Sequence, residues 1–332
     1  MSPTVCSWRW RSIAASRRGR RSNKSIRQSP QGRVNVHVAA VPTEERNPAS
    51  MDLDSLPLAD LLRLINQEDQ TVPLAVAAVL PQIELAVLAG VRALRAGGRI
   101  HYFGAGTSGR AAFADAAELR PTFSLGPDQV VAHVAGGLEA LWSAVEQAED
   151  DDVAGGRDAA DVTAADLVIG VAASGATPYV AGALRHARSV GATTALISSN
   201  PQAPLHEFAD IPIAVDTGPE VITGSTRMKA GTAAKLVLTT FSTAVMVRIG
   251  RTWSNLMVCA VPSNAKLRQR AVRTLMSATG LPADVAQEAI AKADEELPVA
   301  LVMLLSSVDA ETARAALTAA QGMVADAVRH LK

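Results

Sequence analysis

Two hydroxyl-rich loops carry side chains that could bind an anion. The stretch HYFGAGTSGR spaces its glycines as G-x-G-x-x-G and places Thr107 and Ser108 after Gly106. The second loop follows the apolar run DLVIGVAASG and supplies Ser174, Gly175 and Thr177. Backbone amides, hydroxyl groups and helix N-termini can enclose a phosphate without a metal, so these loops predict a phosphate site. The alternative for the first loop is a glycine turn that only allows tight packing.

A third loop, TGPEVITGSTRMKAGT, adds Glu220, Ser225 and Lys229. We expect it to bind substrate beside the first two, and the alternative is a solvated loop before a helix.

The residues around the first loop exclude one nucleotide-binding motif and disfavour a second. A P-loop needs Lys and Ser or Thr after its last glycine, but Arg110 and Ala111 follow here. A Rossmann site needs an acid at the end of the second strand, but QVVAHVAG ends in Gly136 and Gly137.

Carboxylates are the candidate acids and bases, because the six histidines lack metal-ligand spacing and no serine lies in a nucleophile elbow. The segment LEALWSAVEQAEDD is predicted to be helical, and at about 100° per residue Glu149 lies within about 40° of Val145, Trp142 and Leu138 on one apolar stripe. A carboxylate there is either a partnered structural acid or a general base in a cleft. Glu118, on the alanine-rich run AFADAAEL, has no such geometry and by its neighbours alone is a surface acid.

Five short apolar runs position these loops. They are separated by helix-length segments and span residues 99–103, 129–134, 166–172, 193–198 and 211–215. Buried strands that alternate with helices predict an α/β fold with an open parallel sheet, flanked by helices, whose ligands bind at the carboxyl ends of the strands.

The sequence predicts four segments. They are a disordered basic tail (1–43), an N-terminal helical arm (44–95), an α/β domain (96–262) and a small all-α C-terminal domain (263–332). The tail holds nine of the 32 Lys and Arg residues and no acid, and we interpret it as a start annotated too early, with initiation near Val41.

The composition of the chain indicates which classes of partner and which cellular compartment to expect. Without the tail the chain has 23 basic against 32 acidic residues, which disfavours a nucleic-acid partner. No uninterrupted apolar run approaches the ~18 residues of a membrane span. Cys6 and Cys259 form neither a disulfide framework nor a C-x-x-C knuckle, so we expect a cytoplasmic protein.

From about Pro42 to its end the chain resembles the N-acetylmuramic acid 6-phosphate etherases, which are built on the sugar isomerase (SIS) domain. The resemblance rests on motifs in the family's order: TEERNPAS, GAGTSGR, DAAE, AED, ASG with TPY, and the long string GPEVITGSTRMKAGTA. It implies a flavodoxin-like SIS fold and a lyase that splits the D-lactyl ether of the sugar phosphate in cell-wall recycling. It also implies a homodimer, and it matches the family's two functional glutamates to Glu118 and Glu149. The helix predicted through AAFADAAEL separates Glu118 from Ser108 by about 15 Å, which favours active sites near the subunit interface. Because the loops offer hydroxyl groups and amides and the histidines lack metal-ligand spacing, we expect neither a cofactor nor a metal.

The chain departs from the family pattern at two points. Leu119 and Arg120 follow DAAE where the family has Cys-Pro, and Ala176 replaces an arginine of ASGRTPY. The second change removes a positive charge beside the expected phosphate loop. Two other functions share the fold, an aldose–ketose sugar-phosphate isomerase and a non-catalytic sugar-phosphate sensor.

Overall fold

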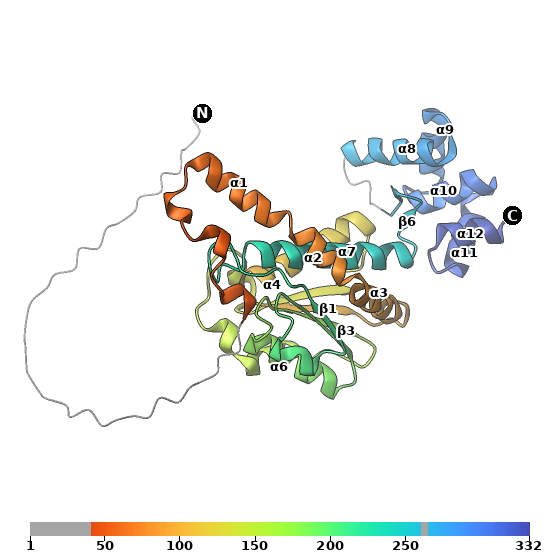
Figure 1. The fold of residues 1–332 in the computed structure, drawn as a ribbon. Helices are drawn as coiled ribbons and strands as arrows, with labels where there is room; N and C mark the ends of the chain where they lie inside the picture. Colours follow the sequence, from red (N-terminus) through yellow and green to blue (C-terminus); the bar gives the residue numbers. More distant parts are fainter. Residues whose placement is uncertain (1–40, 260–264) are drawn as a thin grey trace, which may run out of the picture. The chain divides into compact units, whose positions relative to one another are not determined.

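The structure is a computed structural model that describes residues 41–259 and 265–332 (Figure 1). The tail prediction falls on residues 1–43, of which 1–40 lie outside the described residues.

A five-stranded parallel sheet forms the centre of the α/β domain. Its strands are β1 (Ile100–Gly104), β2 (Val130–Val134), β3 (Leu167–Val171), β4 (Thr193–Ser198) and β5 (Ile211–Ala214), in the order β2-β1-β3-β4-β5. Each predicted strand is present, with ends that agree within one or two residues. The predicted open parallel sheet is therefore confirmed, and its strands read as continuous apolar runs because both faces are covered.

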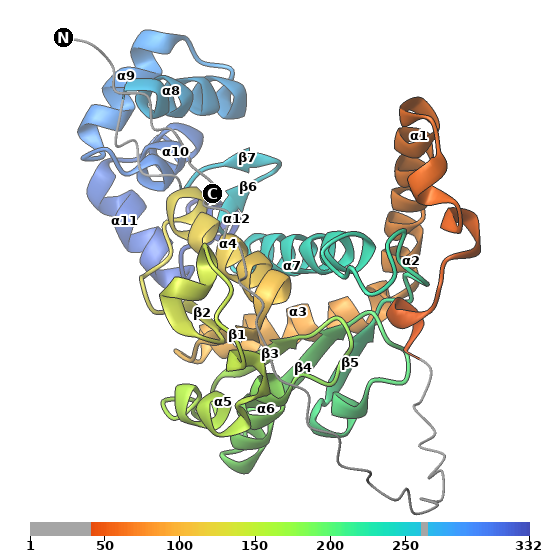
Figure 2. The same cartoon turned by 90° about the vertical axis from the view of Figure 1, so that its left-hand side faces the viewer.

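Helices cover both faces of this sheet (Figure 2). One face packs against α3 (Leu80–Arg95), α4 (Gly106–Phe123) and α7 (Lys229–Arg248) in a core that contains Ile100, Ile169 and Phe241. The other face packs against α6 (Pro178–Ser189), which lies beside α5 (Asp152–Asp158).

Helix α7 is long and apolar enough, by length and composition alone, to cross a bilayer. It packs instead against α2 (Val72–Ala78), α3 and α4, and Val237, Leu238 and Phe241 on it are fully or almost fully buried. Its apolar composition is therefore that of a core helix.

The predicted N-terminal arm is present. Three short 3-10 turns precede α1 (Leu58–Asp69) and α2 (Val72–Ala78). Val79 is not helical and separates α2 from α3. The turns are Pro42–Glu44, Pro48–Ser50 and Leu53–Ser55.

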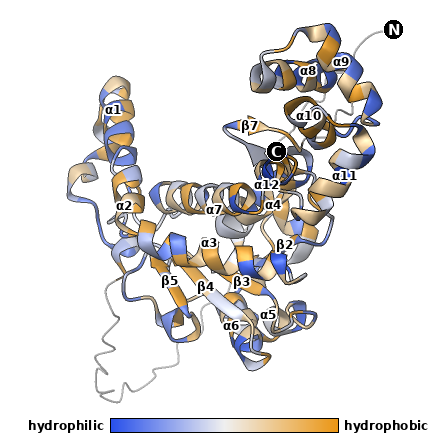
Figure 3. Ribbon diagram, turned by 90° about the vertical axis from the view of Figure 1, so that its right-hand side faces the viewer, coloured by the Kyte–Doolittle hydropathy of each residue, from blue (hydrophilic) through white to orange (hydrophobic). Residues whose placement is uncertain are grey.

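The C-terminal region is helical, as predicted, after a two-stranded antiparallel ribbon that the sequence did not predict. The ribbon consists of β6 (Thr252–Trp253) and β7 (Leu256–Met257), and the helices are α8 (Ala265–Thr279), α9 (Ala283–Lys292), α10 (Leu297–Ser306), α11 (Ala310–Ala319) and α12 (Val324–His330). They enclose a separate hydrophobic core around α10, whose hydrophobic character is visible in Figure 3. The domain boundaries remain predictions.

Candidate functional site

The β1–α4 turn brings strand and helix into backbone contact. A Cβ on Gly109 would lie 2.6 Å from the carbonyl oxygen of Gly104, and Gly106 has a φ of +52°. The turn therefore needs its glycines for packing and for a left-handed residue. It also leaves the first amides of α4 without a side-chain cap, with Thr107 and Ser108 half-buried in the first turn. Free amides and two hydroxyl groups at a helix N-terminus suit an anion.

The β3–α6 loop ends at the same edge of the sheet. Gly175 has a φ of +66°, and a Cβ there would lie 2.2 Å from the Cβ of Ala203. Thr177 is the N-cap residue of α6 but makes no capping hydrogen bond with its side chain. The Oγ of Ser174 accepts only a long bond of 3.3 Å, from the amide of Ala176. Both hydroxyl groups are therefore available to a ligand.

The β4 end adds polar residues that the sequence reasoning missed. Ser198 and Ser199 are buried and line a small hollow together with Ser108, between apolar residues of β3, β4 and α7. Asn200 donates from Nδ2 to the carbonyl oxygen of Ser174 at 3.0 Å, which ties this turn to the β3–α6 loop. The signal was the Ser-Ser-Asn run 198–200 at the carboxyl end of a predicted strand of the same sheet.

Hydrogen bonds to Glu220 attach the third loop to the start of α7. Glu220 is fully buried, and its two carboxylate oxygens accept hydrogen bonds from the amides of Lys229 (2.9 Å) and Ala230 (3.0 Å). This carboxylate thus caps α7, so its observed contacts shape the loop. Ser225 lies in the same loop, half-exposed, and a Cβ on Gly231 would lie 3.3 Å from Thr107 Cγ2, so the starts of α7 and α4 are adjacent.

The side chain of Lys229 is engaged by the N-terminal arm. Its Nζ lies 2.7 Å from Oε2 of Glu68 on α1, and that same oxygen accepts a bond of 2.8 Å from Asn47 Nδ2. These two donors hold the pKa of the Glu68 carboxyl below its ordinary value, although burial acts in the opposite direction.

Glu118 lies on the exposed side of α4, at a groove between α4 and α7. Asp115 lines the same groove and accepts hydrogen bonds from Tyr102 Oη (3.1 Å) and Ser242 Oγ (2.9 Å). Burial raises the pKa of Asp115 above its ordinary value. Further polar side chains line the groove: Thr122, Lys235, Thr239, Ser242 and Thr243. Ser108 lines the hollow at the strand ends and not this groove.

The predicted helix through Glu149 is wrong. The segment forms two short 3-10 turns, Gly137–Leu141 and Ala148–Asp150, and Gln147 between them has a φ of +64°. Arg110 donates to the carbonyl oxygens of Leu141 and Ser143, so these acceptors serve a tertiary contact in place of a helix. The expected apolar stripe is exposed, with Trp142 at 76% and Leu138 at 69%, and Glu149 itself is exposed.

Within residues 41–259 and 265–332, no group of three His, Cys, Asp or Glu side chains is arranged to hold a metal ion. What the structure brings together at the carboxyl ends of β1, β3 and β4 is therefore a set of hydroxyl groups and amides. Such a set can bind a phosphate ester by hydrogen bonds alone.

Comparison with known proteins gives the family. Residues 82–188 match the family model for the glucokinase regulatory protein N-terminal SIS domain, and residues 145–244 match the SIS domain model. An N-acetylmuramic acid 6-phosphate etherase of Thermobifida fusca is 59% identical over 82% of this chain and 89% of its own length. The chain belongs to the N-acetylmuramic acid 6-phosphate etherase family.

Other members of this etherase family are similarly well covered. The etherase of Cutibacterium acnes is 50% identical over 87% of this chain and 97% of its own, and that of Aeromonas hydrophila is 47% identical over 88% and 98%. Among solved structures, a phosphoheptose isomerase from Francisella tularensis is 18% identical, covers 58% of this chain and all of its own, and has a TM-score of 0.47.

Proposed function

We propose that the protein cleaves the D-lactyl ether of N-acetylmuramic acid 6-phosphate to give N-acetylglucosamine 6-phosphate and D-lactate. The observation that carries this proposal is the 59% identity to an etherase over most of both chains, together with the hydroxyl-lined strand ends. The reaction makes the protein a carbon–oxygen lyase of cell-wall amino sugar recycling, and we place it in the cytoplasm.

The 6-phosphate binds at the N-termini of α4 and α6, where no side chain caps the first backbone amides. Thr107 and Ser108 at the start of α4, and Ser174 and Thr177 before α6, offer hydroxyl groups to its oxygens. The amides near Gly106 and Gly175 and the positive ends of the two helix dipoles add to this. No metal is needed for such binding.

The two glutamates carry the proton transfers. In the open-chain sugar the aldehyde acidifies the hydrogen on carbon 2, and Glu149 removes it as general base. Glu118 gives a proton to the ether oxygen as the bond to carbon 3 breaks, so lactate leaves as the hydroxy acid. Water then adds to carbon 3 of the unsaturated aldehyde. General acid and base assistance contributes typically 10²–10⁴-fold to such steps.

The length of α4 supports a site shared between two subunits. Glu118 lies ten residues beyond Ser108, which is about 15 Å at 1.5 Å per residue, and α4 runs without interruption from Gly106 to Phe123. The phosphorus-to-carbon-2 reach of an open-chain sugar phosphate is roughly half that length, from ordinary bond lengths. A subunit therefore does not place its own Glu118 on the sugar it binds, and in a symmetric homodimer the glutamate serves the neighbouring site.

D-lactate release from N-acetylmuramic acid 6-phosphate is the decisive test. We expect release that continues in the presence of a chelator. Ketose formation from an aldose phosphate without lactate would assign the protein to the isomerases, and binding without turnover would make it a sensor. Loss of turnover on chelation, with recovery on adding a divalent ion, would overturn the metal-free account.

A further inference from the structure

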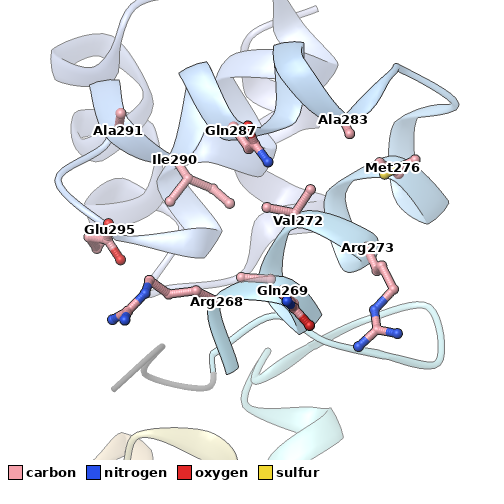
Figure 4. Close-up of a pocket in the computed structure, with 11 residues that line it drawn as sticks. Arg268, Gln269, Val272, Arg273, Met276, Ala283, Gln287, Ile290, Ala291 and Glu295 are labelled. Carbon is pink, nitrogen blue, oxygen red and sulfur yellow. The ribbon is translucent and has the colours of Figure 1, made fainter. Parts of the chain in front are cut away.

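A pocket opens between α8 and α9 of the C-terminal region, away from the residues assigned so far (Figure 4). Its volume is about 540 Å³, within the ~300–1,000 Å³ typical of ligand pockets. Val272, Met276 and Ile290 give it an apolar lining. Arg268 and Arg273 lie on its α8 side, and one acid, Glu295, lies at its edge after α9.

The α8 side of this pocket is strongly basic. The helix contains four basic residues, Lys266, Arg268, Arg270 and Arg273, and no acid. None of the four forms a salt bridge with another residue of the described ranges. The occupant of the pocket should therefore present an apolar side chain within an acidic segment.

The chain carries such a segment at residues 137–152. Six acids and no basic residue lie in it. Trp142 and Leu138 project into solvent with 76% and 69% of their surface exposed. Arg110 fixes the backbone beneath them by donating hydrogen bonds to the carbonyl oxygens of Leu141 and Ser143. Gly136 also packs closely against Val145, because a Cβ on Gly136 would lie 2.8 Å from the Cβ of Val145. Exposed apolar side chains on a backbone fixed in this way are typical of an interaction surface.

We propose that Trp142 and Leu138 of one copy insert into the α8–α9 pocket of a second copy. The inference rests on the homodimer of the proposed function and names its contact. The pocket and the 137–152 segment are both accessible in a single chain, and they are complementary in charge and in apolar character. In a two-fold symmetric pair each copy supplies one pocket and one segment, so every pocket is filled and every segment is covered. The segment also carries Glu149, so in such a pair the partner's basic helix lies beside the turn of Glu149.

Cross-linking between two single-cysteine proteins tests the contact. Copies with Leu138→Cys are mixed with copies with Met276→Cys, both in a background of Cys6→Ser and Cys259→Ala, and are then oxidised. We expect a disulfide-linked pair that contains one copy of each. The control mixture replaces Leu138→Cys by Leu74→Cys on α2, a leucine that is 75% exposed. Equal cross-linking in both mixtures would overturn the proposal. A single chain that carries both Leu138→Cys and Met276→Cys is oxidised separately, and a disulfide within that chain, with no mixed pair in the mixture, would also overturn it.

A dissociation constant measured by sedimentation gives a second test. Trp142→Ala should raise the dimer dissociation constant about 30-fold or more, the scale of an interface hot spot, whereas Leu74→Ala should leave it within about threefold. A larger effect of Leu74→Ala would place the interface on the α2 face and refute the contact. Both tests omit substrate, so a protein that cross-links as expected but releases no D-lactate would contradict the proposed function and leave the contact supported. Circular dichroism of each variant shows whether it is folded.

Discussion

Lys229 at the start of α7 and Glu68 near the end of α1 form a partly buried ion pair, with 2.7 Å between Nζ and Oε2 and exposed side-chain fractions of 4% and 19%. The pair joins the loop before α7 to the N-terminal arm. Three further hydrogen bonds join the same parts: Gly224 N to Thr43 O, Ser50 Oγ to Val221 O, and Asn47 Nδ2 to Pro219 O. The N-terminal arm thus holds the loop before α7 in place through these contacts.

Removing one partner of this pair should be costly. Glu68→Gln leaves the ammonium of Lys229 buried without its counter-charge, and we expect the free energy of unfolding in urea to fall by about 3–5 kcal/mol. The double variant Glu68→Gln with Lys229→Met should recover part of the loss. Asp60→Asn on the same helix breaks an exposed pair with Arg63 and should cost less than about 1 kcal/mol. Equal losses for the two single variants would contradict this.

Mixed dimers test the shared site. Glu118→Gln and Ser108→Ala proteins are each expected to release D-lactate far more slowly than the wild type. A mixed dimer contains one site in which both residues are intact, so mixing should restore part of the activity once subunits exchange. No recovery, with exchange demonstrated by mass spectrometry, would show that each subunit uses its own Glu118.

Solvent hydrogen exchange separates the two glutamates. Glu149→Gln keeps the size of the side chain but removes the base, so both exchange at carbon 2 and lactate release should fall by at least ~10²-fold. Glu118→Gln should keep exchange at carbon 2 while lactate release falls, because only the leaving oxygen loses its proton donor. The opposite pattern would assign the base to Glu118.

A buried histidine should make stability depend on pH. His101 is fully buried, its Nδ1 lies 3.1 Å from His133 Nε2, and Arg99, Asp161 and Asp166 also act on it. Burial lowers the pKa of His101 from 6.5 to about 4. Between pH 4 and pH 6.5 the unfolded chain binds more protons at this histidine than the folded chain does. The contribution of His101 to stability is therefore complete above pH 6.5 and is lost as the pH falls toward 4, by at most about 3 kcal/mol.

The slope of unfolding free energy against pH measures this effect. His101→Gln should flatten the slope between pH 6.5 and 4, whatever its effect on absolute stability. His330→Gln, at an exposed position on α12, is the matched control for the loss of an imidazole. An unaltered slope in His101→Gln would show that other groups cause the acid sensitivity.

The sheet could be predicted from the sequence because strands buried on both faces are continuous apolar runs, and the loops at their carboxyl ends followed from the parallel arrangement. The segment around Glu149 could not, because its conformation depends on Arg110, whose hydrogen bonds reach residues more than 30 positions away. The ion pair between Glu68 and Lys229 joins residues 161 positions apart and leaves no local pattern. Ser198 and Ser199 were predictable in principle, since they lie at the carboxyl end of a strand that was correctly predicted.

The crossing of α5 and α6 fixes the turn that carries Glu149. A Cβ on Gly155 would lie 1.8 Å from the carbonyl oxygen of Tyr179, and one on Gly182 would lie 1.8 Å from that of Asp152, so the two backbones touch with no side chain between them. Two helices in such contact leave no space for one to slide against the other, and they should open to amide hydrogen exchange as one cooperative unit. The glutamate turn, directly before α5, is thereby attached to the slowly exchanging interior of the α/β domain, although the turn itself lies at the surface.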